Sequence, residues 1–219
     1  MSKIVWDEVG KHLYETGVKN GVLYPQDSTG AYPKGVAWNG LTAVNENPSG
    51  ADASDIYADD DLYLTLRGKE IFGATIEAYT YPDEFGVCDG SAELAQGITI
   101  GQQARKAFGL SYRTSIGNDV DGVDHGYKLH LIYGATASPS SKNYQTINDN
   151  PEAIMTLSWE IKTTPIKVTG HKPTACLTID STKVAEGVMK KIEDKLYGTE
   201  TGEATLPTPD EILALVTTG

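Results

Sequence analysis

The chain has few cysteines and no long apolar run. Cys88 and Cys176 are its only cysteines. Two thiols so far apart in sequence form neither a disulfide framework nor a tetrahedral zinc site, so we expect both to be buried free thiols. No run of about 18 apolar residues occurs, which excludes a membrane-spanning helix. The N-terminal residues MSKIVWDEVG lack the apolar region of a signal peptide, so export is not expected.

Basic residues are absent between Lys34 and Arg67. Six acids lie in that gap and supply half of the net charge of −12: Glu46, Asp52, Asp55, Asp59, Asp60 and Asp61. A chain this acidic offers no basic groove to neutralise phosphates, so we expect no specific binding of nucleic acid. The charge gap is therefore a local feature of this segment.

Motifs for catalysis or metal binding are also missing. The four histidines lack the short spacing of a metal site, and no serine or cysteine motif is placed to partner one as a base: His12, His125, His130 and His171. Asp119, Asp121 and Asp124 resemble a calcium loop, but the acid at its twelfth position is missing and the glycine comes one place early. A solvated turn stabilised by Gly122 is favoured. We therefore expect no enzyme, no cofactor and no metal.

Alternation of apolar and polar residues predicts a chain built mainly of strands. It is strongest in Tyr127–Ser138 and Ala153–Thr163, where Leu157, Trp159 and Ile161 share one face and Ser158 and Glu160 the other. Further strands are predicted at Gly35–Val44, Lys106–Ile116 and Ala175–Ile179. Asn20-Gly21 indicates a tight hairpin within Leu13–Tyr24. A second hairpin is predicted over Leu62–Ala78 with its turn at Gly68-Lys69, and Asn45–Asp61 is expected to be a long loop.

Helical spacing is clear in one segment, where Val184, Val188, Ile192 and Leu196 recur every four residues. Asp180, Ser181 or Thr182 can cap it, and Gly198 can end it. After a polar linker, Thr208 and Glu211 form a capping box in front of a short apolar turn. That turn has no obvious place in the chain's own core, so it is expected to dock on a neighbouring subunit through Ile212, Leu213, Leu215 and Val216.

These elements predict a mainly β fold, a β-sandwich or partly open barrel with one amphipathic helix. Residues 1–198 are expected to form the sandwich domain, with the long loop at residues 45–61. Residues 199–219 are expected to form a linker and a short docking helix.

Several stretches of the chain resemble the major tail proteins, or tail tube proteins, of long-tailed, non-contractile bacteriophages. The resemblance is closest over Gly117–Pro165 and extends to YETGVKNGVLYPQ, WNGLTAVNENPSGA, EAYTYPDEF and TLPTPDEILALV. It implies a structural subunit that assembles into stacked, hexameric rings, which form the conduit for DNA ejection. It also implies that the loop at Asn45–Asp61 reaches the adjacent ring. The implied partners are copies of the chain, the tape measure protein and the tail initiator and terminator proteins, in a virion tail assembled in the host bacterial cytoplasm without a membrane.

DNA passing through such a tube would slide past a wall of carboxylates without sticking. Candidate lumen acids on polar strand faces or at their mouths are Glu77, Glu160, Asp59, Asp60 and Asp61. The twelve tyrosines leave open an alternative, a carbohydrate-binding β-sandwich module, although tyrosine is also common on half-buried strands and at interfaces. A β-sandwich lyase is a third and weaker reading.

Overall fold

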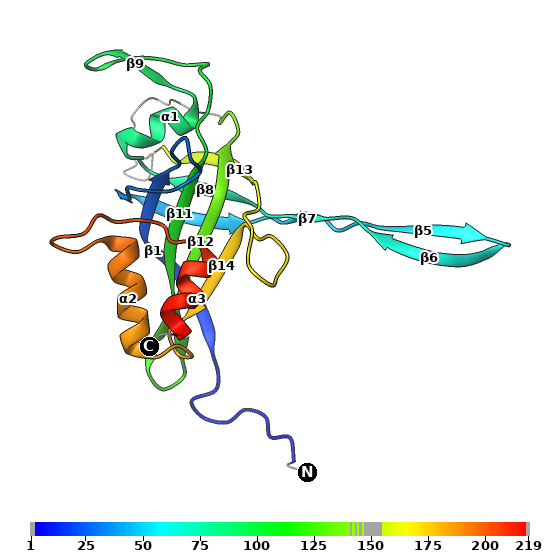
Figure 1. Ribbon diagram of the computed structural model, residues 1–219. Helices are drawn as coiled ribbons and strands as arrows, with labels where there is room; N and C mark the ends of the chain where they lie inside the picture. The colour runs from blue at the N-terminus through cyan, green and yellow to red at the C-terminus, as the bar shows by residue number, and fades with distance from the viewer. Residues whose placement is uncertain (1–2, 141, 143, 145, 147–154, 218–219) are drawn as a thin grey trace.

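The computed structural model describes residues 3–140, 142, 144, 146 and 155–217. Its fold is mainly β, as predicted (Figure 1). The strands are β1 Tyr14–Pro25, β2 Val36–Trp38, β3 Leu41–Glu46, β4 Ser49–Gly50, β5 Ala53–Ala58, β6 Asp61–Arg67, β7 Glu70–Ile71, β8 Gly73–Ala78, β9 Ala92–Ala95, β10 Ile98–Ile100, β11 Phe108–Asn118, β12 Gly122–Ala137, β13 Leu157–Thr163 and β14 Cys176–Asp180. The helices are a 3-10 turn at Asp83–Phe85, α1 Gly86–Asp89, α2 Glu186–Tyr197 and α3 Pro209–Thr217.

One antiparallel sheet of eight strands forms the body, in the order β2-β1-β11-β12-β13-β8-β3. The long strand β12 pairs with β11 along one edge and with two strands, β13 and β14, along the other. Its C-terminal part pairs with β13 at Ala135–Ala137, and its earlier part pairs with β14 at Lys128–Ile132. The sheet remains open, with β2 and β3 at its ends.

The sheet curls around the first of two hydrophobic cores. Side chains from both ends of the strand order meet there, including Trp38 of β2 and Val44 of β3, and the 3-10 turn adds Phe85. The ring centroids of Trp38 and Phe85 are 4.6 Å apart, and those of Phe85 and Trp159 are 5.1 Å apart. Because strands that are far apart in the sheet share these contacts, the core fixes the curvature of the sheet.

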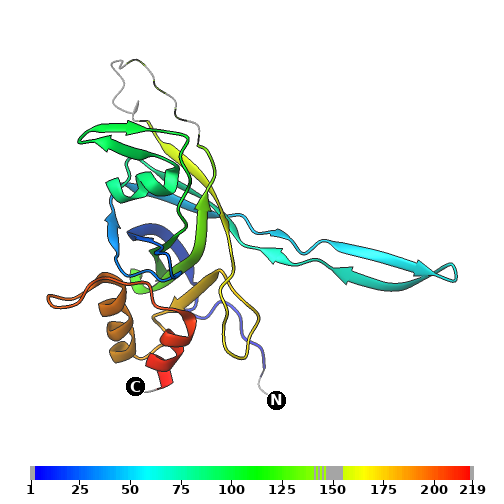
Figure 2. The same cartoon turned by 45° about the horizontal axis from the view of Figure 1, so that its top comes forward.

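The second core lies on the opposite face, under α2 and α3 (Figure 2). Leu129, Leu131 and Tyr133 point to this face, whereas Ile132 points to the first core, as the period of two in β12 requires. Val188, Met189, Ile192 and Leu196 supply the apolar stripe of α2 that the sequence spacing predicts. The body is therefore a curled sheet with one core inside and one helix-covered core outside.

The strongest strand predictions are confirmed. Leu157, Trp159 and Ile161 are buried while Ser158, Glu160 and Lys162 are exposed. Ala153 and Ile154, which the prediction placed in the same strand, lie outside the described residues. The predicted strands at Tyr127–Ser138, Lys106–Ile116 and Ala175–Ile179 correspond to β12, β11 and β14.

Two predicted hairpins are wrong. Asn20-Gly21 lies inside the single strand β1, where the register with β11 shifts between Lys19 and Val22, and Asn20 takes a φ of 54°. The positive φ expected of Asn20 is present, but it makes a bulge instead of a turn. The predicted hairpin over Leu62–Ala78 is also wrong, since β6 pairs with β5 and β8 pairs with β3 and β13. Strand alternation gives the strands, and distant partners decide their pairing.

The helix start differs from the prediction. Asp180 accepts hydrogen bonds from the backbone N–H and the hydroxyl of Thr182, at 2.9 and 2.6 Å, and so caps the turn before the helix. Helix α2 begins at Glu186 with Ala185 in the N-cap position and no side-chain cap. Gly198 ends it with a φ of 78°, as expected.

Candidate assembly surfaces

A long two-stranded arm projects from the body (Figures 1 and 2). It replaces the loop expected at Asn45–Asp61, and that expectation is wrong because the segment pairs with the residues that follow it. β4 pairs with β7, and β5 pairs with β6. At the foot of the arm, the Asn47 N–H donates to the carbonyl of Gly73 at 2.7 Å, and the Asn47 amide donates to the Thr75 hydroxyl at 3.2 Å.

Two aspartates form the turn at the tip of the arm. Ala58 pairs with Asp61, and Asp59 and Asp60 between them have φ values of 52° and 64°. Positive φ at both central residues is the mark of the tight turn that suits the twist of a hairpin, and aspartate tolerates it better than most residues. The run of acids therefore has a backbone role, and it places three carboxylates at the far end of the arm.

Large apolar side chains on the arm are open to solvent. Their exposed fractions run from 40% for Ile56 to 70% for Tyr63, with Tyr57, Leu62 and Leu66 between. None of these five belongs to either core. A two-stranded hairpin alone is marginally stable in water, so the two strands of the arm contribute little stability by themselves.

The structure brings two of the five candidate lumen acids together. Glu77 of β8 pairs with Ser158 of β13, and Glu160 of β13 pairs with Thr75 of β8, so both acids lie on the same polar face of adjacent strands. Asp59, Asp60 and Asp61 lie elsewhere, at the tip of the arm. The five acids do not form one site.

A histidine lies where the arm meets the body. Glu46, the last residue of β3, accepts a hydrogen bond from the Tyr112 hydroxyl at 2.8 Å. The rings of Tyr112 and His130 are stacked with centroids 4.7 Å apart. On its other side, His130 Nε2 lies 2.9 Å from the Thr114 hydroxyl, which itself donates to Glu15 at 2.6 Å.

Burial and charge act on His130 in opposite directions. Burial lowers its pKa and outweighs the nearby carboxylates of Glu46 and Glu15, which raise it. Its Nδ1 atom is buried, has no hydrogen-bond partner among the described residues, and lies 3.8 Å from a carboxylate oxygen of Glu46. The spacing of the histidines in the sequence gives His130 no role, because the contacts that distinguish it come from β1, β3 and β11.

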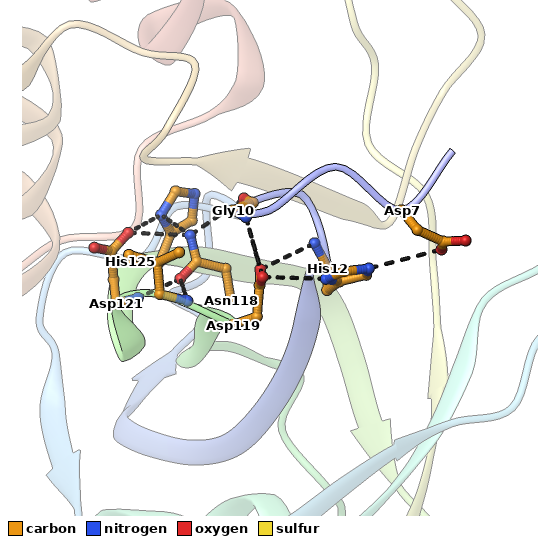
Figure 3. Close-up of polar contacts among 8 residues, drawn as sticks. Asp7, Gly10, His12, Asn118, Asp119, Asp121 and His125 are labelled. Carbon is orange, nitrogen blue, oxygen red and sulfur yellow. Dashed lines mark hydrogen bonds and ion pairs between the residues drawn. The ribbon is translucent and has the colours of Figure 1, made fainter. Parts of the chain in front are cut away.

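The N-terminal segment is tied to the turn between β11 and β12 (Figure 3). The Asp119 carboxylate accepts hydrogen bonds from the Gly10 N–H at 3.0 Å and the His12 N–H at 3.3 Å, and His12 Nδ1 lies 3.1 Å away. These contacts lower the pKa of Asp119 to about 2, and the hydrogen bond from the Gly10 N–H contributes most. Beyond this tie Ile4, Val5, Trp6 and Val9 are exposed, Trp6 by 73%.

The same turn explains the residues that resembled a calcium loop. The Asn118 side-chain oxygen accepts from the N–H groups of Val120 and Asp121, and its amide donates to Asp121 at 3.0 Å. His125 Nδ1 lies 2.9 Å from Asp121 (Figure 3). Over the described ranges, no group of three or more histidine, cysteine, aspartate or glutamate side chains is placed to hold a metal ion.

The C-terminal helix packs on its own chain. Its capping box is confirmed: the Thr208 N–H donates to Glu211 at 2.7 Å, and the Glu211 N–H donates to the Thr208 hydroxyl at 3.3 Å. Ile212 is only 5% exposed and belongs to the second core, so the expectation that this turn lacks a place there is wrong. Leu215 packs at the edge of that core, whereas Leu213 and Val216 are exposed. A role for these residues between subunits stays a prediction.

The two cysteines differ. Cys88 is buried as expected, and burial raises the pKa of its thiol to about 12. Cys176 is exposed, contrary to expectation. It lies on β14, which pairs with β12 alone within the described residues. Both are free thiols.

A basic loop that sequence reasoning missed lies between β13 and β14. Ile166 and Thr174 pair at its foot, through backbone hydrogen bonds of 2.8 and 3.0 Å. Asp210 of α3 holds its far side by accepting from the Thr169 N–H at 3.0 Å and the Thr169 hydroxyl at 2.8 Å. The signal was available in the sequence, since residues 161–179 contain no acid.

Comparisons with known proteins add little to this picture. No protein-family model matches the chain, and no curated protein matches it. Among solved structures, the anti-feeding prophage baseplate aligns over 82% of this chain and 97% of that chain, with a TM-score of 0.37 and 6% identity. The sheath/tube terminator of an extracellular contractile injection system, PVC, aligns over 81% and 99%, with a TM-score of 0.34 and 10% identity. The tube-terminating cap of the anti-feeding prophage aligns over 83% and 97%, with a TM-score of 0.34 and 8% identity. With TM-scores below 0.5 and identities of 10% or less, these three likenesses establish neither a family nor a function for this chain.

Proposed function

We propose that the chain is a non-catalytic structural subunit that assembles with copies of itself into the tube of a phage-type tail. The observation that carries this proposal is the arm. An exposed β-ribbon with apolar side chains along it and a defined turn at its tip is suited to reach a neighbouring subunit. A contact of one surface with a different surface of the next copy builds rings when the rotation closes, and tubes when rings stack.

Open sheet edges support the same proposal. β2 and β3 end the main sheet, and β14 has one free edge. Unpaired edges invite association with another chain, and joining sheets around a ring satisfies them. Hexameric rings, a tape measure protein in the lumen, initiator and terminator proteins and a place in the virion tail belong to this proposal through the sequence resemblance.

The carbohydrate-binding alternative gains nothing from the structure. Tyr24, Tyr32, Tyr112 and Tyr133 are buried in the two cores and cannot form a platform for a sugar. The exposed tyrosines are spread over the molecule. Tyr57 and Tyr63 lie on the narrow arm, and Tyr14, Tyr79 and Tyr144 are exposed elsewhere. In the described part of the chain, no helix is both long and apolar enough to cross a membrane.

The experiment compares the full chain with an arm-less variant in which an Asn-Gly turn replaces residues 48–71. Asn47 and Gly73 already share a hydrogen bond at the foot of the arm, so the body should fold without the arm. We expect electron microscopy of the concentrated full chain to show rings or tubes, and the arm-less chain to stay monomeric. Near-ultraviolet circular dichroism of buried Trp38 and Trp159 checks folding. Tubes formed by the arm-less chain, or a full chain that stays monomeric when concentrated, would contradict the proposal.

A further inference from the structure

Charges of opposite sign are separated along the chain. Residues 35–66 contain six acids and no base, and residues 161–179 contain three lysines, one histidine and no acid. The first group includes the tip of the arm, with Asp59, Asp60 and Asp61. The second includes the loop at residues 167–172, which we call the basic loop, with Lys167, His171 and Lys172 exposed. Each surface carries the charge that the other lacks.

The basic loop is held in shape by contacts that leave its lysines free. Its foot is closed by the pairing of Ile166 with Thr174, and Asp210 accepts two hydrogen bonds from Thr169. The His171 N–H donates to the carbonyl of Val168 at 3.3 Å. Within the described ranges, Lys167 and Lys172 form no ion pair, in contrast to Lys190, which pairs with Asp194 at 3.3 Å.

The tip of the arm also has a defined backbone shape and, among the described residues, unpaired charges. The positive φ values of Asp59 and Asp60 form its tight turn, so three exposed aspartates lie together at the end of the hairpin. In the described structure Asp59, Asp60 and Asp61 form no ion pair, and Tyr57 and Tyr63 beside them are exposed. The tip therefore offers acids at its end and aromatic rings on its flanks.

The tip cannot reach the basic loop of its own chain. The loop lies beside the root of the arm, and the tip lies at the far end of the ribbon (Figures 1 and 2). At about 3.3 Å per residue, the strand from residue 47 to residue 58 spans roughly 36 Å. The partner must therefore be a second molecule.

We propose that the acidic tip of the arm docks on the basic loop of a second copy of this chain. The inference rests on the proposed function and names the surface that receives the arm. Tip and loop are different surfaces, so each copy can give one contact and accept another, and the same step repeats from copy to copy. Exposed ion pairs add little energy each, so the charges set partner and register while Tyr57, Leu62 and Tyr63 bury apolar area.

Charge exchange tests the proposal directly. In the tip variant D59N/D60N/D61K, asparagine keeps the two positive φ values and the charge changes sign. The loop variant is K167E/K172E. The control K34E/K191E makes the same charge change at two exposed lysines that form no ion pair in the described structure. The fourth protein combines the tip and loop variants in one chain.

We expect the tip and loop variants each to raise the critical concentration for assembly at least tenfold. The combined variant should return it to within about threefold of the full chain, and the control should leave it unchanged. Carbodiimide cross-linking of unaltered assemblies should join Lys167 or Lys172 to Asp59, Asp60 or Asp61 of another copy, as read by mass spectrometry. Dilute samples, in which the chain is monomeric, should lack that cross-link.

The outcomes separate this inference from the proposed function. Tip and loop variants that assemble like the control, while the arm-less chain does not assemble, would overturn the docking surface and leave the function standing. Failure of the combined variant to assemble, with native circular dichroism, would also overturn it. Assembly of the arm-less chain would instead overturn the function.

Discussion

At the scale of the residue, the contacts of His130 decide where its proton lies. The Thr114 hydroxyl donates to Glu15, so its oxygen is left to accept from His130 Nε2–H. The neutral ring then presents the lone pair of Nδ1 toward Glu46, 3.8 Å away, which explains why this buried atom has no hydrogen-bond partner. A second proton on the ring would appear opposite the carboxylate at the root of the arm.

We expect the pKa of His130 to lie below its usual value of about 6.5, because burial outweighs the carboxylates. Glu46→Gln removes one cause that raises this pKa and should lower it further. A depressed histidine pKa stabilises the fold above the unfolded value, and that stability is lost as the pH falls through the folded value. Histidine NMR signals over a pH titration measure the shift.

Three other residues surround His130. Lys128 lowers its pKa through charge, Tyr112 stacks on the ring, and Thr178 is its partner on β14. His130→Gln is the control, because it should remove the loss of stability between about pH 7 and pH 5. Equal pH dependence of unfolding in both proteins would refute the prediction.

At the scale of the element, substitutions at two adjacent residues of α3 test whether the helix belongs to the second core. Ile212 is 5% exposed and Leu213 is 52% exposed. We expect Ile212→Ala to lower the free energy of unfolding by about 2–4 kcal/mol, since it leaves a cavity in the second core, and Leu213→Ala by less than about 0.5 kcal/mol. Urea denaturation of the monomer measures both. Equal effects of the two substitutions would show that α3 does not belong to that core in solution.

Elements set by local pattern were predictable from the sequence. The alternation of Leu157, Trp159 and Ile161 gave β13, the four-residue spacing gave α2, and Thr208 with Glu211 gave the start of α3. Each of these signals lies within a few residues of the chain, where propensity and periodicity operate.

The arm was not predictable by the same means. Asn45–Asp61 is rich in residues that favour turns, and only pairing with Leu62–Ile71 makes it a ribbon. Asp59 and Asp60 take the positive φ values of a tight turn, but an acidic run without glycine gives only a weak turn signal in the sequence. The basic loop was missed for a related reason, since its importance lies in how it complements a surface far away in sequence.

At the scale of the whole molecule, the polar face of β8 and β13 is a candidate for the inner wall of the tube. Glu77 and Glu160 are diagonal neighbours there. If that face lines the lumen, E77K/E160K tubes should retain DNA at low salt and release it as salt rises, through counterion release. Gel-shift and co-sedimentation of assembled tubes with DNA measure this.

The matched control is E200K/E203K, which makes the same charge change at two exposed acids between α2 and α3. We expect tubes of the control variant to retain no short DNA fragments in their lumen. If E77K/E160K tubes bind no more DNA than unaltered tubes at low salt, the two acids lie outside the lumen.

The pairing of β1 with β11 also governs how the chain reaches its fold during synthesis. Tyr14 meets Gly117 and Pro25 meets Phe108, so the first strand waits for partners that lie roughly 80 to 100 residues later. At roughly 5–20 residues per second, the ribosome needs about 5–20 s to supply them. During that interval β2 is the only neighbour of β1 in the sheet that has been made, and the apolar side chains Leu23 and Trp38 lack most of their core. Until β11 is made, one edge of β1 is free to pair with another copy of the chain. The risk of premature pairing between copies is therefore greater in the nascent chain than in the finished subunit.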